Sequence, residues 1–176
     1  MIEAVGACAF VSVAANIKPE EHIPMALAQL EAFVCIEALS TFFRTAPIDR
    51  PEQPDYLNGV ARIRTDMAPL DLKTAVLRVI ETALGRERTD DAYAARCIDL
   101  DLILYQDYVV HNDDLTLPDP DILTRPFLSA GILELAPDIT LPGDTEALAT
   151  HVSQREMAEL NKDTAFTRIL KERFTP

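Results

Sequence analysis

Hydrophobic and polar positions divide the chain into alternating strand-like and helix-like segments. Residues 4–13 are small, β-branched and apolar, which is typical of a buried strand. Residues 19–34 carry apolar side chains at helical spacing, after a proline and two acids that suit a first helical turn. Residues 39–45 and 56–65 predict two further strands. The three prolines of residues 46–55 predict a long loop between them.

The second half of the chain continues this pattern. Residues 69–84 form one apolar stripe that ends at Gly85, so they predict a helix with a glycine stop. Residues 97–105 predict a fourth strand, and we expect residues 108–110 to pair back on it. The remaining elements are expected to be a loop over 118–126, a short helix over 127–135 and amphipathic helix from about residue 145.

The order of these elements is β-α-β-β-α-β, followed by helices. It predicts an α+β fold of the ferredoxin-like split βαβ type, an antiparallel sheet with helices on one face. No linker or repeat interrupts the pattern, so we expect a single domain over residues 1–176, with a C-terminal helical extension over 151–176. The extension could pack on the open side of the sheet or form a homodimer, and the sequence leaves both open.

The chain is acidic, with a formal net charge of −13, which argues against a nucleic-acid partner. Its positive charge is concentrated, however, because Arg78, Arg86, Arg88 and Arg96 fall within nineteen residues. A local basic pocket of this kind can attract an anion whatever the net charge is. No apolar run is long enough for a membrane span, and the N-terminal residues lack the basic region of a signal peptide, so we expect a cytoplasmic location without a membrane partner.

Two aspartates alternate with apolar residues in the fourth predicted strand. Because side chains alternate between the faces of a strand, Asp99 and Asp101 should share the solvent face, about 6 to 7 Å apart. Two carboxylates so placed repel each other unless a cation lies between them, and Mg²⁺ accepts such ligands together with substrate phosphates. The alternative is a pair of solvated acids on the wet face of a sheet.

Two arginines follow the predicted helix directly, in Gly85-Arg86-Glu87-Arg88. Guanidinium groups match phosphate oxygens in a bidentate manner. A basic helix end that complements the helix dipole is the alternative interpretation. Beside a pair of metal-binding carboxylates, arginines are what phosphoryl-group transfer requires, because that chemistry depends on positioning and charge neutralisation.

An aromatic ring and an amide stand two residues apart in Asp55-Tyr56-Leu57-Asn58. Tyr56 and Asn58 share a face if a strand begins there. The ring can stack on a flat heterocycle while the amide reads its donors and acceptors. An exposed tyrosine beside a turn asparagine is the alternative.

The segments FRTAP, QPDYLN, GRxR, RxxDLDLIL, LxxP and RxF follow one another in this order between about Ala7 and Pro142. In this order and spacing the chain resembles the 6-hydroxymethyl-7,8-dihydropterin pyrophosphokinases (HPPK) of folate synthesis. The resemblance implies the split βαβ fold and an enzyme that transfers a diphosphate from ATP to 6-hydroxymethyl-7,8-dihydropterin. The products would be AMP and the pterin diphosphate, formed by direct in-line transfer.

The same resemblance implies roles for individual residues. Asp99 and Asp101 would hold two Mg²⁺ ions, and Arg86 and Arg96 would neutralise charge as AMP leaves. The residues expected to hold ATP, as co-substrate, are Glu81, Arg88, Thr116 and Arg125. The residues expected to hold the pterin are Tyr56 and Phe127 on its two faces, Thr45 and Asn58 at its polar edge, and Ile48 beside it.

Three departures from the family pattern fall on the nucleotide side. Ala14-Ala15-Asn16 stands in place of Gly-Ser-Asn, Tyr93-Ala94-Ala95 in place of Trp-Gly-Pro, and Pro118-Asp119 in place of Pro-His. An acid at residue 119 is expected to repel phosphate. The alternative function is therefore a non-catalytic or diverged pterin-binding homologue with an altered ATP site, and a third reading is an unrelated ferredoxin-like metal-binding domain.

Overall fold

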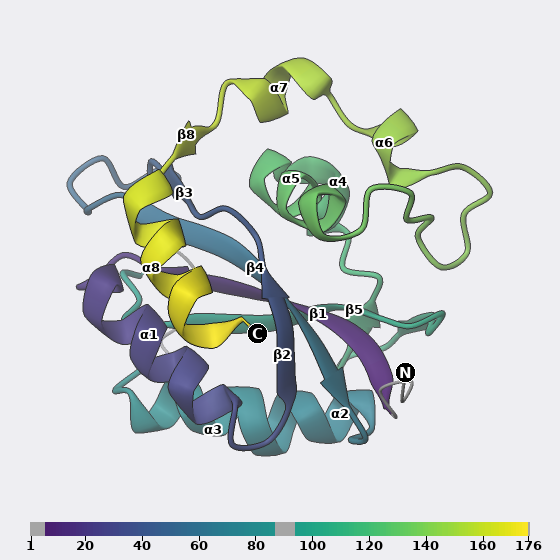
Figure 1. The fold of residues 1–176 in the computed structure, drawn as a ribbon, viewed down its shortest axis with the longest axis horizontal. Coiled ribbons are helices and arrows are strands. Elements are labelled where there is room, and N and C mark those ends of the chain that lie inside the picture. The colour runs from purple at the N-terminus through teal and green to yellow at the C-terminus, as the bar shows by residue number, and fades with distance from the viewer. Residues whose placement is uncertain (1–5, 87–93, 176) are drawn as a thin grey trace.

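The computed structural model describes residues 6–86 and 94–175. Among these residues, six strands form one antiparallel sheet (Figure 1). Its central strands are β1 (Ala7–Ala15), β4 (Tyr56–Thr65) and β5 (Asp99–Tyr105), with β1 between the other two. These strands confirm the first, third and fourth predicted ones, and β4 has the predicted bounds. The mixed architecture confirms the predicted α+β, split βαβ class.

The second predicted strand is two strands, so the expectation of one strand over 39–45 is wrong. β2 (Cys35–Leu39) and β3 (Phe43–Thr45) both pair with β4, and residues 40–42 interrupt them. The interruption has a side-chain cause: the Ser40 hydroxyl accepts a hydrogen bond from the Val60 N–H at 2.8 Å. Phe42 is fully buried against Gly59, where a Cβ atom would lie only 2.7 Å from the Phe42 ring.

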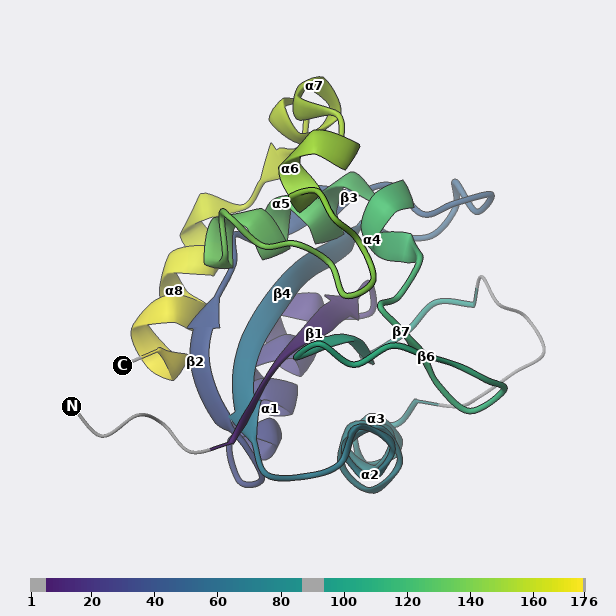
Figure 2. The same cartoon turned by 90° about the vertical axis from the view of Figure 1, so that its right-hand side faces the viewer.

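Helices cover both faces of the sheet, and not one face as the sequence predicts (Figures 1 and 2). On one face, α1 (Pro19–Leu30) and the helical segment of residues 69–83 enclose the larger hydrophobic core. On the other face, α5 (Pro126–Leu135) packs on β4 and encloses a second core around Phe10, Val60 and Ile103. Gly131 permits this approach, since a Cβ atom there would lie 2.7 Å from the Val60 side chain.

The helix predicted over residues 69–84 is observed with an irregular middle. α2 (Pro69–Asp71) leads into a π-helical stretch, η1 (Leu72–Leu77), and then into α3 (Arg78–Ala83). The stop at Gly85 is confirmed by its positive φ of 87°. A π turn holds more residues than an α turn, so it changes which side chains of the segment face β5. The apolar stripe alone does not reveal this change.

Residues 108–110 do not pair back on β5, contrary to the prediction. Instead β6 (Val110–His111) pairs with β7 (Thr116–Leu117) in a separate small hairpin. At the outer edge of β5, the Ile103 carbonyl accepts a hydrogen bond from the Asp119 N–H at 2.9 Å. The predicted loop 118–126 contains a short helix, α4 (Asp121–Thr124), directly before α5.

The C-terminal extension returns to the sheet. After α6 (Leu148–His151) and α7 (Gln154–Ala158), β8 (Asn161–Lys162) pairs with β3, a strand that the sequence does not predict. α8 (Thr164–Phe174) then buries Phe166, Leu170 and Phe174 in the larger core. Packing within the chain is therefore the observed role of α8. None of the described helices has the length and apolar composition needed to cross a membrane.

We expect α8 to stabilise the fold through Phe166. Its ring meets Phe42 edge to face, with centroids 5.7 Å apart, and it is 7% exposed. Phe166→Ala should lower the free energy of unfolding by about 3 kcal/mol, measured by urea denaturation. Ile169→Ala on the same helix is the matched control, because Ile169 is 56% exposed and should change stability by less than about 0.5 kcal/mol. Equal effects of the two variants would contradict this packing.

Candidate active site

Strand register brings the predicted pterin-binding and metal-binding residues to one face of the sheet. Ala14 of β1 lies opposite Asn58 on one side and opposite Asp99 on the other. Two residues earlier on β1, Ser12 lies opposite Val60 of β4 and Asp101 of β5. Directly paired residues of antiparallel strands point to the same face. The amide of Asn58 and both carboxylates are thus presented together, on the face whose other half is covered by α5.

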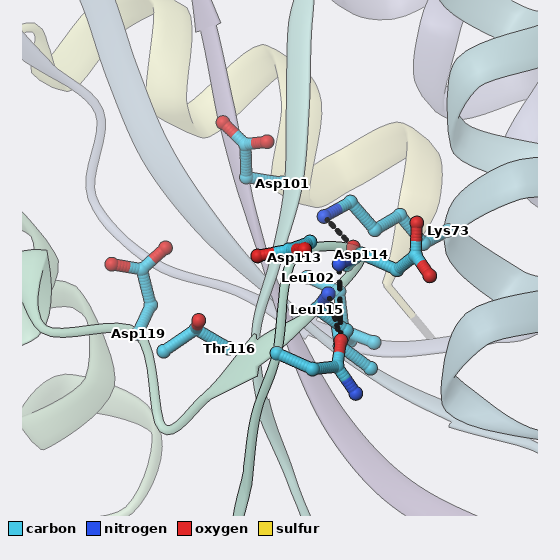
Figure 3. A pocket seen from close by; sticks show the side chains of 9 residues that line it. Lys73, Asp101, Leu102, Asp113, Asp114, Leu115, Thr116 and Asp119 are labelled. Atoms are coloured by element: carbon cyan, nitrogen blue, oxygen red, sulfur yellow. Dashed lines mark hydrogen bonds between the residues drawn. The ribbon is translucent and has the colours of Figure 1, made fainter.

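Asp101 lies at the edge of a cavity of about 170 Å³ (Figure 3). Thr116 and Asp119 line the same cavity, so the structure brings Thr116 to the cavity that Asp101 borders. Asp101 keeps contact with solvent, yet surrounding protein desolvates it in part. This desolvation, followed by the charges of Asp99 and Glu81, raises the pKa of Asp101 from 3.8 to about 7. A site with this electrostatic character favours a cation.

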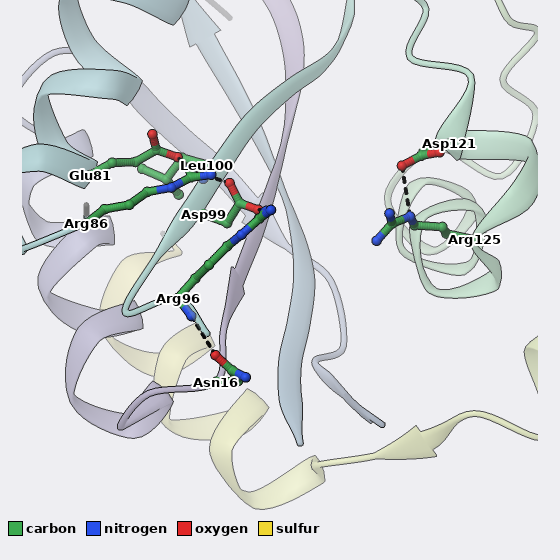
Figure 4. A network of polar contacts seen from close by, with 8 residues as sticks. All are labelled: Asn16, Glu81, Arg86, Arg96, Asp99, Leu100, Asp121 and Arg125. Atoms are coloured by element: carbon green, nitrogen blue, oxygen red, sulfur yellow. Dashed lines mark hydrogen bonds and ion pairs between the residues drawn. The ribbon is translucent and has the colours of Figure 1, made fainter. Parts of the chain in front are cut away.

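Asp99 is buried, so the prediction that it is exposed beside Asp101 is wrong. Its side chain is 11% exposed, because two arginines cover it (Figure 4). The Arg86 guanidinium donates to one carboxylate oxygen, and the Arg96 guanidinium donates to the other. The three residues therefore form one partly buried ion-paired network, in which both predicted catalytic arginines converge on a predicted metal ligand.

Glu81 belongs to the same network. It is 2% exposed, and one carboxylate oxygen accepts hydrogen bonds from the Arg86 guanidinium and, at 2.8 Å, from the Leu100 N–H. Its backbone carbonyl also accepts from the Arg86 N–H at 3.0 Å. Glu81 thus fixes Arg86 relative to β5. Its expected contact with ATP stays a prediction.

Asn16 holds the other arginine, and it is not among the site residues predicted from the sequence. Its side-chain oxygen accepts from the Arg96 N–H at 2.7 Å, and its amide nitrogen donates to Gln53 at 3.1 Å and to the Pro54 carbonyl at 3.3 Å. Asn16 thereby joins the end of β1 to the start of β5 and to the loop of residues 46–55. The sequence did point to Asn16, because it is the one residue of the family's Gly-Ser-Asn pattern that this chain retains.

The predicted pterin residues Thr45, Tyr56 and Asn58 also lie together. The Asn58 amide donates to the Thr45 hydroxyl at 2.8 Å, and Thr45 pairs with Tyr56 across the strands. Desolvation raises the pKa of the half-buried Tyr56, the nearby charges of Arg96, Arg86 and Arg125 oppose that shift, and the charge of Asp99 adds to it. Tyr56 is therefore close enough to Arg86 and Arg96 for their charges to influence its pKa.

The remaining predicted residues are exposed or have other contacts. Ile48 is 54% exposed in the loop between β3 and β4. Phe127 lies in the first turn of α5 and packs partly on the second core, and its stacking on the pterin opposite Tyr56 stays a prediction. Arg125 pairs with Asp121 at 2.8 Å, on the opposite side of the view in Figure 4 from Arg96. Arg88 and Tyr93 lie outside the described residues.

The donor set suits a hard divalent cation that is shared with a substrate. Within residues 6–86 and 94–175, no group of three or more acidic, histidine or cysteine side chains is arranged to hold a metal ion. Asp99 and Asp101 supply two carboxylates, and Mg²⁺ is commonly bound by one or two carboxylates together with substrate phosphates and water. The residues present therefore fit Mg²⁺ that arrives with a nucleotide.

Comparison with known proteins gives a consistent result. The model of the 7,8-dihydro-6-hydroxymethylpterin-pyrophosphokinase family matches residues 10–137. The chain is 32% identical to the 2-amino-4-hydroxy-6-hydroxymethyldihydropteridine pyrophosphokinase of Haemophilus influenzae, over 87% of this chain and 98% of that protein. It is 34% identical to the enzyme of the same name from Pseudomonas aeruginosa, over 76% of this chain and 83% of that protein.

Solved structures show the same fold at low sequence identity. A Plasmodium falciparum HPPK-DHPS structure with pteroate matches 99% of this chain with a TM-score of 0.67 and 10% identity. An HPPK-DHPS structure in complex with substrates matches 96% with a TM-score of 0.64 and 12% identity. The chain spans 45% of the length of each of these proteins.

Replacing the two aspartates should have different effects on the stability of the protein. Asp99→Asn should lower the free energy of unfolding by about 2 to 4 kcal/mol, because Arg86 and Arg96 lose the buried charge that they share. Asp101→Asn is the matched control and should not destabilise the metal-free protein at about pH 8. Urea denaturation in the presence of a chelator measures both. A stable Asp99→Asn variant would contradict the buried network.

The pH dependence of the same pair of measurements follows from the raised pKa of Asp101. The folded protein keeps this proton up to about pH 7, whereas the unfolded chain releases it near pH 3.8. The folded state binds more protons in this window, so Asp101 lowers stability as pH rises from about 4 to about 7. The stability of Asp101→Asn relative to wild type should increase across this window. A constant difference would refute the assignment.

Proposed function

Because the chain belongs to the 7,8-dihydro-6-hydroxymethylpterin-pyrophosphokinase family, we propose that the Asp99, Arg86 and Arg96 network is its catalytic centre. The enzyme transfers a diphosphate from ATP to 6-hydroxymethyl-7,8-dihydropterin in folate biosynthesis, with AMP as the second product. The observation that carries the assignment of the centre is the convergence of both arginines on Asp99. Asp99 and Asn58 lie on either side of Ala14, which pairs with both.

The reaction joins the pterin hydroxymethyl oxygen to the β-phosphorus of ATP and breaks the bond between that phosphorus and the oxygen of AMP. The hydroxyl proton leaves to solvent. Arg86 and Arg96 donate hydrogen bonds to phosphate oxygens, so negative charge that builds on the departing AMP is neutralised where it forms. Glu81 and Asn16 hold these arginines in place through side-chain and backbone contacts.

The hydrogen bonds observed around Asp99 bear on how a cation could bind there. Its two carboxylate oxygens are taken by Arg86 and Arg96. A cation on Asp99 would compete with these guanidinium groups for the carboxylate oxygens, and N–H groups released from Asp99 would become available to phosphate. We propose that Asp99 and Asp101 hold two Mg²⁺ ions, which would neutralise phosphate charge when bound.

On the pterin side, we propose that Asn58 and Thr45 hydrogen-bond the polar edge of the ring while Tyr56 and Phe127 stack on its faces. The hydrogen bond between Asn58 and Thr45 supports this, because it fixes the amide in one orientation. Glu81, Arg88, Thr116 and Arg125 are proposed to hold ATP. The sequence pattern supports a cytoplasmic location as a further proposal.

The alternative, a pterin-binding homologue without catalysis, gains no support from the site. Binding of a pterin alone would need neither a pair of arginines on a buried aspartate nor the raised pKa of Asp101. Asp119 is the residue that favoured this alternative. Its carboxylate accepts a hydrogen bond from the Asp121 N–H at 2.8 Å, so it has a structural role at the start of α4.

The transfer itself is tested by incubating the purified chain with ATP, Mg²⁺ and 6-hydroxymethyl-7,8-dihydropterin. We expect AMP and pterin diphosphate in equal amounts, and no turnover in Asp101→Ala, which removes a proposed metal ligand without breaking the Asp99 network. Resolved nucleotide products provide the measurement. Formation of ADP would instead indicate attack at the γ-phosphorus, and absence of AMP would favour the non-catalytic homologue.

Pterin recognition should be separable from nucleotide binding. Asn58→Ala should weaken pterin binding by about 1 to 3 kcal/mol, because polar groups of the buried ring edge lose their partner. Calorimetric titration with pterin and with an ATP analogue measures the two affinities, and that for the analogue should not change. Asn161→Ala, at an exposed position of β8, is the control. Equal loss of both affinities in Asn58→Ala would contradict its role as a pterin contact.

A further inference from the structure

The cavity beside Asp101 has acidic walls with one basic side chain among them. It lies between η1, β5 and the β6–β7 hairpin, and Lys73 reaches it from η1 (Figure 3). Among the described residues that line it, Lys73 carries the positive charge, while the carboxylates belong to Asp101, Asp113, Asp114 and Asp119. An anionic nucleotide that enters this cavity therefore meets like charge on most sides.

Lys73 is held in a defined position within the cavity wall. Its ammonium group donates to the backbone carbonyl of Asp114 at 2.7 Å, which joins η1 to a hairpin 41 residues further along the chain. The Asn112 side chain closes that hairpin by accepting from the Asp114 N–H at 3.0 Å and the Leu115 N–H at 2.9 Å. Lys73 thus ties the hairpin that carries Thr116 to the helical segment opposite.

The π turn contributes to this placement. Successive residues of an α-helix are rotated by about 100°, so the additional residue of a π turn rotates the preceding side chains by about that angle relative to α3. Lys73 stands at the start of this stretch, and its neighbour Leu72 is fully buried. A regular helix continued back from Arg78 would direct Lys73 elsewhere.

The charge of Lys73 also acts on the acidic wall. Desolvation raises the pKa of Asp119, and the positive charges of Arg125 and Lys73 oppose this shift. Lys73 is therefore within electrostatic reach of the residue that is expected to repel phosphate. Its charge offsets part of that repulsion before any ligand binds.

We propose that Lys73 is a positioning residue for the nucleotide, which fixes the Asp114 carbonyl and the Thr116 hairpin and offsets the charge of Asp119 and its neighbours. This inference rests on the proposed function, in which Thr116 and Asp101 belong to the ATP side of the site. It explains how an acidic wall can serve an anionic co-substrate: the compensating cation comes from η1 and not from the hairpin itself.

The test compares Lys73→Gln and Lys73→Arg with wild type in steady-state kinetics. Lys73→Gln should raise KM for ATP about three- to tenfold, the range for loss of one charged hydrogen bond near the surface, and change kcat and the KM for pterin less than twofold. Lys73→Arg should restore most of the loss, because the positive charge and the donor are retained. Lys171→Gln is the control, since it removes an equal charge that pairs with Glu134 on α5.

Three outcomes would overturn the proposal: an unchanged KM for ATP in Lys73→Gln, an equal rise for both substrates, or an equal effect in Lys171→Gln. Calorimetric titration with an ATP analogue and Mg²⁺ separates this proposal from the proposed function. If wild type forms no AMP yet binds the analogue more tightly than Lys73→Gln does, the proposed function fails and the role of Lys73 stands. If wild type does not bind the analogue, both fail.

Discussion

A buried carboxylate must be paired, and in this chain that requirement falls on Asp99. An ionised group removed from water is costly unless opposite charge and hydrogen bonds compensate. Arg86 and Arg96 provide both, so the end of α3 and the start of β5 converge on one side chain. Glu81 and Asn16 then fix the two arginines against the sheet. The two arginines, which we propose bind phosphate, are thereby assembled around one carboxylate.

The same principle reconciles an acidic chain with an anionic co-substrate. The net charge is −13, yet positive charge is concentrated at the proposed site. Arg86 and Arg96 converge on Asp99, and Lys73 lines the cavity beside Asp101. Charge at short range through a partly desolvated site outweighs more distant charge that solvent and salt screen. The excess of acids at the surface therefore does not argue against ATP.

The sequence predicted the structure correctly where the residues of a single segment determine it. Apolar alternation is sufficient to define β4, and the glycine stop at Gly85 depends on local backbone geometry alone. Distant partners explain the failures. The break between β2 and β3 depends on Ser40 bonding to Val60, and the burial of Asp99 depends on Arg86, 13 residues earlier, as well as on Arg96 just before β5. Lys73 meets a carbonyl 41 residues away, which no local pattern indicates.

We propose that Asp99 and Asp101 would hold a metal ion when the nucleotide binds, and that this ion would compete with Arg86 and Arg96 for the oxygens of Asp99. Anomalous diffraction at the manganese edge, from crystals grown with Mn²⁺, a non-hydrolysable ATP analogue and pterin, tests it most directly. We expect anomalous peaks within coordination distance of both Asp99 and Asp101, with Arg86 and Arg96 hydrogen-bonded to phosphate oxygens. Bound nucleotide with both arginines still on Asp99, and no metal beside it, would contradict the account.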